Sequence, residues 1–446
     1  MTRSPRSNIQ RGGPPNTRHA NLNHHVPHSS ATSRLRDAAR LPRALVRFLL
    51  ILLAVPAVPL AGAETKPWRQ DRLLVTFWCP PPATDTNLAT VAAEGYNLTW
   101  TPESGLDVAH RHGLKAMLQD PLLTPESLDD AGKKASLKAL VERVRTHPAL
   151  EAYYIVDEPS AGAFGGLGRL ADFLREHDPA HFTYINLFPT YANNTQLGNK
   201  GDTVTAYREH LRQFSAAVKP ALISYDHYHF FKNRDGAEYF LNLAMIRDSA
   251  REAKVPFLNI IQASTIENSW RLVNADELRF LVYSTLAYGG RGISYFLYWG
   301  PTNYGGIYQD GVRSPLAAPI TKLNREIESL SPALMSLESR AVYHAAPVPR
   351  GGEAVPDSSP VRFEGDPDCL LGLFGTGSSA HPVAFMVANR SYKAETVARL
   401  RLPSEARRLE EFDRSTSHWK RITNWKRGTP LTVTLRPGDG QLFRYH

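Results

Sequence analysis

Residues 150–159 read Leu-Glu-Ala-Tyr-Tyr-Ile-Val-Asp-Glu-Pro, and this stretch decides the fold class. Apart from Glu151 it begins as an apolar and aromatic run, which is the pattern of a strand buried on both faces. Acidic residues are disfavoured in strands and proline interrupts strand pairing, so we expect the strand to end at about Val156. Asp157 and Glu158 then lie at the carboxyl end of a buried strand, the edge where active sites form in parallel α/β folds. The alternative is that Asp157 caps the next helix while Glu158 faces solvent.

Short apolar runs alternate with helical patterns on both sides of this stretch. The expected strands are residues 73–78, 96–100, 114–118, 150–156, 181–187, 221–225, 257–261 and 292–298. The expected helices are residues 86–94, 106–112, 127–146, 164–177, 207–218, 237–253, 275–288 and 320–337. This number of strand–helix pairs in a chain of this length predicts a (β/α)8 TIM barrel. An open doubly wound sheet is the rival, but it usually has a glycine-rich turn after its first strand, and residues 79–82 read Cys-Pro-Pro-Pro instead.

The pattern changes after about residue 337. Short apolar runs at 341–348, 369–374, 383–387, 398–402 and 431–435 are separated or followed by turn signals rich in glycine. We therefore expect a small all-β sandwich at the C-terminus. The predicted organisation is a basic extension with a signal peptide over residues 1–63, the barrel over 64–338 and the sandwich over 339–446.

Composition and charge narrow the class of protein. Hydrophobic residues make up 42% and charged residues 21% of the 446 residues, which is typical of a globular chain. The formal charge of +9 is concentrated at the N-terminus: residues 1–63 hold nine arginines, no lysine and one acid, a net +8. The rest of the chain therefore carries only +1, and we expect no nucleic-acid partner.

The N-terminal segment has the features of an export signal. The apolar run at residues 48–60 is short, contains two prolines and is followed by Ala61-Gly62-Ala63, a small-residue cleavage pattern. A transmembrane anchor is the alternative, but it needs a longer run. We expect cleavage before Glu64, a secreted or periplasmic protein and no stable membrane insertion. The two cysteines, Cys79 and Cys369, are expected to be buried thiols rather than a disulfide.

The carboxyl ends of the eight expected strands carry a ring of carboxylates, amides and aromatic side chains. Flat aromatic rings stack on sugar rings, while acids and amides bind sugar hydroxyls, so the ring predicts an oligo- or polysaccharide ligand. Any single aromatic residue at a strand end more often packs in the core or at the end of the barrel, so the prediction rests on their clustering. The predicted substrate-binding residues are Trp78, Asp120, Asp157, Asn186, His227, Tyr228, Gln262, Tyr298 and Trp299. Trp100 and the loop aromatics Tyr191, Trp270, Tyr304 and Tyr308 would extend the site.

Hydrolysis of a sugar bond needs two carboxyl groups, one protonated and one ionised. Glu158 is the predicted general acid, because a glutamate among aromatic rings can have a raised pKa. Asp226 is the predicted second carboxylate and Glu267 the second choice, although Asp226 could instead cap a helix or bind a hydroxyl. We predict no cofactor and no metal, since the pair His227 and His229 lacks the partners of a metal-dependent barrel.

Residues 72–337 resemble the clan A glycoside hydrolases, most closely the family 42 β-galactosidase-like barrels. The resemblance to the clan rests on Asp157-Glu158-Pro159. The chain also resembles secreted bacterial proteins of uncharacterised function that share this sequence together with Tyr225-Asp226-His227-Tyr228 and Tyr298-Trp299. In that clan the acid/base is the glutamate of an Asn-Glu-Pro sequence that ends the fourth strand. The resemblance therefore implies an acid/base role for Glu158.

Two positions depart from the pattern of the clan. Asp157 stands where the clan has asparagine, and Gln262 stands where the clan has the nucleophilic glutamate at the end of the seventh strand. Three interpretations follow: Asp226 or Glu267 replaces the nucleophile, the enzyme inverts through a carboxylate-held water, or the chain is no hydrolase. We predict a secreted glycoside hydrolase, with a catalytically inactive carbohydrate-binding protein as the alternative.

Overall fold

The computed structural model describes residues 66–266, 269–377 and 381–446, which belong to one compact unit. The predicted signal peptide and Glu267 lie outside the described residues. Within those ranges, every helix is too short or too polar to cross a membrane.

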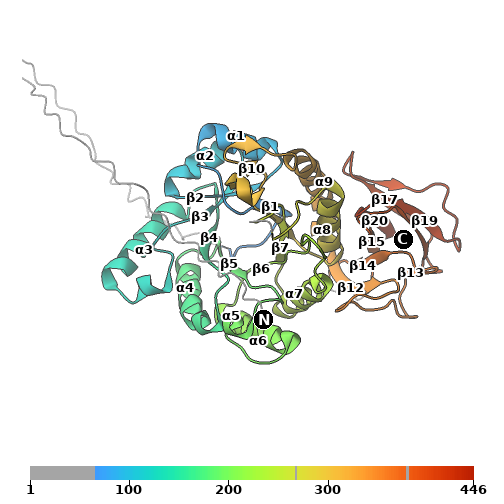
Figure 1. Cartoon of the computed structure of the whole chain (residues 1–446), viewed down its shortest axis with the longest axis horizontal. Coiled ribbons are helices and arrows are strands. Elements are labelled where there is room, and N and C mark those ends of the chain that lie inside the picture. Colours follow the sequence, from blue (N-terminus) through green and yellow to red (C-terminus); the bar gives the residue numbers. More distant parts are fainter. Residues whose placement is uncertain (1–65, 267–268, 378–380) are drawn as a thin grey trace, which may run out of the picture. The chain divides into compact units, whose positions relative to one another are not determined.

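Eight parallel strands form the sheet that the sequence predicts, in the order β1-β8-β7-β6-β5-β4-β3-β2. Helices surround these strands, as Figure 1 shows, so the (β/α)8 barrel is confirmed. The strands are β1 (Leu74–Phe77), β2 (Leu98–Thr101), β3 (Lys115–Leu118), β4 (Leu150–Asp157), β5 (Phe182–Leu187), β6 (Ile223–Asp226), β7 (Phe257–Gln262) and β8 (Gly292–Phe296).

The seam between β1 and β2 is closed by one asparagine side chain. Asn97 Oδ1 accepts the N–H of Val75 at 2.9 Å, and Asn97 Nδ2 donates to the carbonyl of Leu73 at 2.8 Å. The backbone N–H of Asn97 also donates to the carbonyl of Val75 at 3.1 Å. These bonds take the place of ladder bonds between the two strands and leave fewer unpaired backbone groups at the seam.

Several helices of the barrel, among them α1 and α8, begin at a side chain that caps them. Thr84 accepts the N–H of Asn87 before α1, and Asn274 forms a reciprocal capping box with Glu277 at the start of α8. The helices are α1 (Asp85–Ala93), α2 (Leu106–Arg111), α3 (Ala131–Val144), α4 (Phe164–His177), α5 (Asn194–Leu197), α6 (Thr203–Val218), α7 (Tyr239–Ala253), α8 (Ala275–Ala287) and α9 (Ala317–Met335).

A small three-stranded sheet lies between β8 and α9. It is formed by β9 (Trp299–Gly300), β10 (Tyr308–Gln309) and β11 (Val312–Arg313). Strand β8 therefore ends at Phe296, two residues earlier than expected, and Tyr298 lies beyond it.

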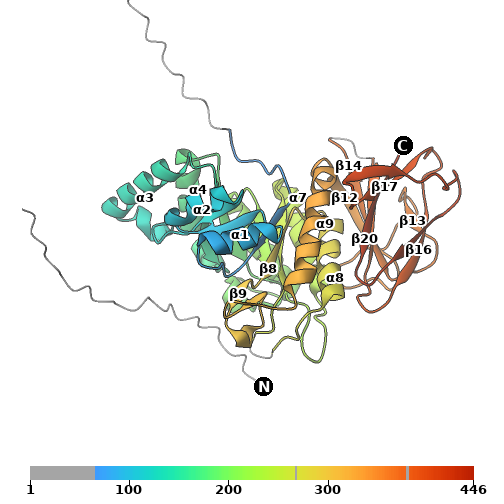
Figure 2. The ribbon, with the colours of Figure 1, turned by 90° about the horizontal axis from the view of Figure 1, so that it is seen from above.

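The C-terminal β-domain consists of two sheets, which fit the predicted sandwich (Figure 2). Buried side chains of both sheets, among them Val387 and Leu400, form one hydrophobic cluster. The first sheet has the order β12-β14-β15-β20-β17-β18 and the second β13-β16-β19. The strands are β12 (Glu338–His344), β13 (Arg362–Phe363), β14 (Cys369–Gly375), β15 (Ala384–Asn389), β16 (Thr396–Arg401), β17 (Leu409–Asp413), β18 (His418–Arg421), β19 (Leu431–Leu435) and β20 (Gly440–Tyr445).

The β-domain packs closely on α8 of the barrel. A Cβ atom at Gly372 in β14 would lie 2.1 Å from the carbonyl oxygen of Ala287, so only glycine permits this approach. Arg414, which follows β17, donates to Asp439 at 2.9 Å and to Glu326 of α9 at 3.2 Å. These contacts join the two parts through packed backbone and a half-buried ion network.

Candidate active site

The carboxyl end of β4 presents both acids of the Asp-Glu pair. Asp157 is the last residue of β4 and is exposed, whereas the following Glu158 is half-buried. Glu158 has a φ angle of +46°, in the left-handed region that non-glycine residues rarely adopt, and such backbone strain costs about 1–3 kcal/mol. The N–H of Glu158 donates to the carbonyl of Asn186 at 2.9 Å, which anchors this turn to β5.

Asn186 joins three acidic residues from neighbouring strands into one cluster. Its Nδ2 donates to Asp157 Oδ1 at 3.0 Å and to Asp226 Oδ1 at 2.9 Å. The carboxyl groups of Glu158 and Asp226 are themselves hydrogen-bonded to each other. Asn186 Oδ1 accepts from Ser224 Oγ at 3.0 Å, which fixes the orientation of the amide. We refer to Asp157, Glu158, Asn186 and Asp226 as the acidic cluster.

The electrostatics of the acidic cluster favour one shared proton on Glu158. Burial raises the pKa of Glu158 far above its ordinary value, and the charges of Asp226 and Asp157 raise it further. Burial and the charge of Asp157 also raise the pKa of Asp226, but the amide of Asn186 and the hydrogen bond from Glu158 oppose this rise. Glu158 therefore keeps its proton at neutral pH and donates it to an ionised Asp226.

Asp157 remains the exposed acid of the cluster. Surrounding protein atoms raise the pKa of Asp157 to about 6, and the hydrogen bond from Asn186 limits the rise. Asp157 is thus mostly ionised at pH 7 while water still reaches it. A carboxylate of this kind can accept hydrogen bonds from sugar hydroxyls or stabilise positive charge nearby.

Aromatic side chains from the loops after β5, β6 and β7 and from the end of β8 lie beside the cluster. The ring centroid of Tyr228 is 4.2 Å from that of Trp270 and 5.3 Å from that of Phe296. Tyr191 is 48% exposed, and its hydroxyl accepts the N–H of Tyr228 at 3.4 Å. Burial and then the charge of Asp226 raise the pKa of Tyr228, which lies close to this acid. The group forms an apolar wall against which a sugar ring could stack.

Two predicted substrate-binding residues hold the loops together instead. Gln262 is fully buried: its Oε1 accepts the N–H of Phe230 at 2.9 Å, and its Nε2 donates to the carbonyls of Phe230 at 3.0 Å and Arg271 at 3.1 Å. His227 is 1% exposed, with Nδ1 at 2.9 Å from Asn242 Oδ1. These placements do not support the predicted contact of Gln262 and His227 with substrate, because Gln262 binds loop backbone and His227 is buried against Asn242 of α7.

The predicted pair at the end of β8 is also structural. Tyr298 is buried and donates to Glu94 Oε2 at 3.0 Å, while Trp299 stacks on Tyr308 with ring centroids 5.7 Å apart. Tyr308 and Arg313 both donate to Glu94 Oε1, at 3.0 and 3.2 Å. Beyond the end of β8 this segment is hydrogen-bonded to the residues after β1 and packs around Glu94, so its placement does not support substrate binding.

Trp78 and Asp120 lie at strand ends but in different surroundings. Trp78 is buried with other interior side chains of the barrel, and its ring centroid is 4.7 Å from that of Trp100. Asp120 Oδ1 accepts the N–H of Leu122 at 2.8 Å and so caps its own loop. Trp78 belongs to the packed interior below the acidic cluster, and the carboxylate of Asp120 serves its own loop.

Sequence reasoning missed the residues that orient the cluster. Ser224 Oγ lies 2.9 Å from the hydroxyl of Tyr184, and this pair supports Asn186 from below. Alternate residues of a strand share one face, so Ser224, two residues before Asp226 in β6, could have been expected on the same side as the acidic cluster. In the described parts of the chain, no group of three or more His, Cys, Asp or Glu residues is arranged to hold a metal ion. Cys79 and Cys369 are both free thiols.

A second missed feature connects the β-domain with the loops of the barrel. Tyr392 donates to Asp235 in the loop after β6, and Arg271 in the loop after β7 donates to the same carboxylate at 3.0 Å. The guanidinium of Arg271 also lies over the ring of Phe230, 4.4 Å from its centroid. Trp270 directly precedes Arg271, so the contacts of Arg271 with Asp235 and Phe230 hold this part of the aromatic wall in position.

No protein-family model and no curated protein matches this chain. Solved structures do resemble it. A glycoside hydrolase family 5 protein from Bacteroides vulgatus has a TM-score of 0.52 at 10% identity, covering 84% of this chain and 88% of its own. A β-galactosidase from Marinomonas ef1 has a TM-score of 0.46 at 13% identity, covering 59% of this chain. The match spans 62% of the length of the Marinomonas enzyme. The likeness shows the barrel fold, and membership of family 42 stays a prediction.

Proposed function

We propose that this chain is a secreted glycosidase in which Glu158 is the general acid. The observation that carries the proposal is the hydrogen-bonded pair of Glu158 and Asp226 beside the exposed Asp157. A carboxyl group that stays protonated at neutral pH is what protonation of a glycosidic oxygen requires. The names of the solved structures above, a glycoside hydrolase and a β-galactosidase, support a carbohydrate as the substrate class.

The contact between Glu158 and Asp226 changes the role expected for Asp226. The two carboxyls of a retaining glycosidase are about 5–5.5 Å apart and those of an inverting one about 6.5–9.5 Å apart. A hydrogen-bonded pair is closer than either, so Asp226 does not face Glu158 across a glycosidic bond. We assign Asp226 the role of an ionised partner that keeps the proton on Glu158.

The reaction then proceeds on one acid and one exposed carboxylate. Glu158 gives its proton to the glycosidic oxygen, the bond from the anomeric carbon to this oxygen breaks, and the electron pair leaves with the alcohol. The carboxylate of Asp157 stabilises the positive charge that develops at the anomeric carbon. Water attacks this carbon and gives its proton to the carboxylate of Glu158, which restores the resting state.

A second candidate, a catalytically inactive carbohydrate-binding protein, is favoured by one observation. Gln262 ends β7, and its side chain is hydrogen-bonded to backbone groups of the loops at Phe230, Ser264 and Arg271. The clan to which the chain shows resemblance has a nucleophilic glutamate at this position. An aromatic wall without a nucleophile could bind a sugar without cleaving it.

A panel of aryl glycosides and polysaccharides tests the proposal with three proteins. The wild type should hydrolyse at least one substrate, and Glu158→Gln should lower kcat by about 10²–10⁴. Glu142→Gln is the matched control, because it makes the same change in an exposed acid of α3 that pairs with Lys138, and it should leave kcat unchanged. Full activity of Glu158→Gln would contradict the proposal, and sugar binding without turnover by the wild type would support the second candidate. N-terminal sequencing of the exported protein should begin at Glu64.

A further inference from the structure

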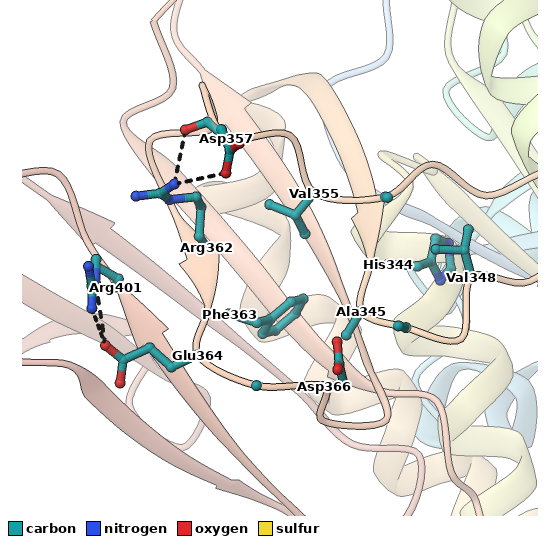
Figure 3. Close-up of a pocket in the computed structure, with 13 residues that line it drawn as sticks. His344, Ala345, Val348, Val355, Asp357, Arg362, Phe363, Glu364, Asp366 and Arg401 are labelled. Atoms are coloured by element: carbon teal, nitrogen blue, oxygen red, sulfur yellow. Dashed lines mark hydrogen bonds and ion pairs between the residues drawn. The ribbon is translucent and has the colours of Figure 1, made fainter.

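The β-domain contains a pocket of about 470 Å³ that is separate from the barrel mouth (Figure 3). It is formed by the end of β12, the loop that follows, β13 with its turn and the end of β16. The residues that matter here are His344, Ala345, Val355, Phe363, Asp366 and Arg401. The volume falls in the range of about 300–1,000 Å³ that small-molecule sites occupy.

Phe363 gives the pocket a flat apolar surface. It is half-buried, and its strand pairs with β16 so that Phe363 lies opposite the buried Leu400. The side chain packs on the core of the β-domain, which holds its ring in one orientation. Figure 3 shows the ring between Val355, Ala345 and Asp366. A fixed, partly open aromatic face is suited to stacking on the C–H face of a sugar ring.

Polar side chains surround this ring. Arg401 donates to Glu364 at 2.9 Å, and Arg362 lies 3.4 Å from the carboxylate of Asp357. Asp366 is exposed and, in the described ranges of the chain, has neither a hydrogen bond nor an ion pair through its side chain. A carboxylate with open acceptor positions next to a ring can bind a pair of hydroxyl groups.

The charge of the lining favours a neutral ligand. The ionisable residues of the lining, apart from His344, are two arginines and three acids, a formal balance of −1. His344 adds no charge, because burial and the nearby Arg390 lower its pKa to about 3. Both arginines are already paired with acids, so a phosphate or a sugar acid would find no free cation among these groups.

We propose that the pocket around Phe363 is a second saccharide-binding site, which takes neutral hexose units of an oligo- or polysaccharide chain. The choice of ligand rests on the proposed function of the barrel. Two sites on one polymer raise the effective concentration of the chain at the enzyme, so this site would assist action on polysaccharides but not on small glycosides.

Retention on insoluble polysaccharides tests the site separately from catalysis. The probes are cellulose, β-mannan and β-galactan, each incubated with wild type, Phe363→Ala, Asp366→Ala and Trp425→Ala. Trp425 packs against the same hydrophobic cluster but lies outside the pocket, so it is the matched control. The same four proteins are assayed for hydrolysis of a small aryl glycoside and for thermal unfolding.

If the pocket binds saccharide, wild type and Trp425→Ala should be retained on at least one of the three polysaccharides. Phe363→Ala and Asp366→Ala should bind that probe at least tenfold more weakly while their activity on the aryl glycoside is unchanged. Asp366 is exposed on a turn, so its variant remains informative if Phe363→Ala unfolds. Retention of a folded Phe363→Ala at the wild-type level, or no retention of the wild type on any probe, would overturn the proposal. Retention that depends on Phe363 in a protein without glycosidase activity would refute only the proposed function of the barrel.

Discussion

Replacement of Asp226 by asparagine should move the pH dependence of catalysis in a defined direction. The substitution keeps the shape of the side chain and removes the charge next to Glu158. Glu158 acts in its protonated form, so activity is lost as the pH rises through the pKa of Glu158. The charge of Asp226 raises this pKa, and its removal should therefore shift the basic limb of the profile to lower pH.

The size of the shift follows from Coulomb's law. Two charges about 4 Å apart interact by about 4 kcal/mol at an effective dielectric constant of about 20. One pH unit corresponds to about 1.4 kcal/mol, so the basic limb should move down by about two to three pH units. Burial still raises the pKa of Glu158 in the variant, which keeps some activity at neutral pH.

The assay is kcat/KM for the best aryl glycoside between pH 4 and pH 10. Asp172→Asn serves as the control and should reproduce the wild-type profile, because Asp172 is an exposed acid of α4 that pairs with Arg175. A basic limb in Asp226→Asn at the wild-type position, or at higher pH, would refute the reasoning that Asp226 maintains the proton on Glu158.

Three further predictions concern the same residues and their supports. Asp157 acts as a carboxylate and has a pKa of about 6, so the activity of the wild type should fall below about pH 6. Asp157→Asn should lower kcat by about 10² and should no longer show this loss of activity at acidic pH. The raised pKa of Glu158 means that the folded state holds its proton above pH 4.5 while the unfolded state releases it. The free energy of unfolding should therefore fall as the pH rises from that value, and urea unfolding should show Glu158→Gln more stable than wild type at pH 8 but not at pH 4. Tyr392→Phe removes one hydrogen bond to Asp235, so it should lower the free energy of unfolding in urea by about 1 kcal/mol and raise KM. An unchanged KM would show that the β-domain does not position the aromatic wall.

The barrel could be predicted because its strands are continuous apolar runs. The predicted strand at residues 150–156 is observed at Leu150–Asp157, since burial on both faces leaves a strong signal in the sequence. Helix α5, Asn194–Leu197, was missed because four residues are too few to show a helical period.

The composition of the site was harder to predict than the fold. Asp157, Asn186 and Asp226 were named from their strand ends, and they do meet in one cluster. A strand-end position does not say which way a side chain points, so Gln262 and Tyr298 were placed at the mouth although they are buried against loops and Glu94. The distance between Glu158 and Asp226 depends on the tertiary fold, so their direct contact could not be predicted.

The dependence of the rate on the leaving group tests the acid role of Glu158 most directly. A phenyl glycoside needs protonation of its leaving oxygen, whereas a 2,4-dinitrophenyl glycoside departs as a stable anion. If Glu158 is the acid, Glu158→Gln should lose about 10³ in kcat/KM on the phenyl glycoside and less than about tenfold on the dinitrophenyl glycoside. Equal losses on both substrates, or no loss on either, would contradict this role.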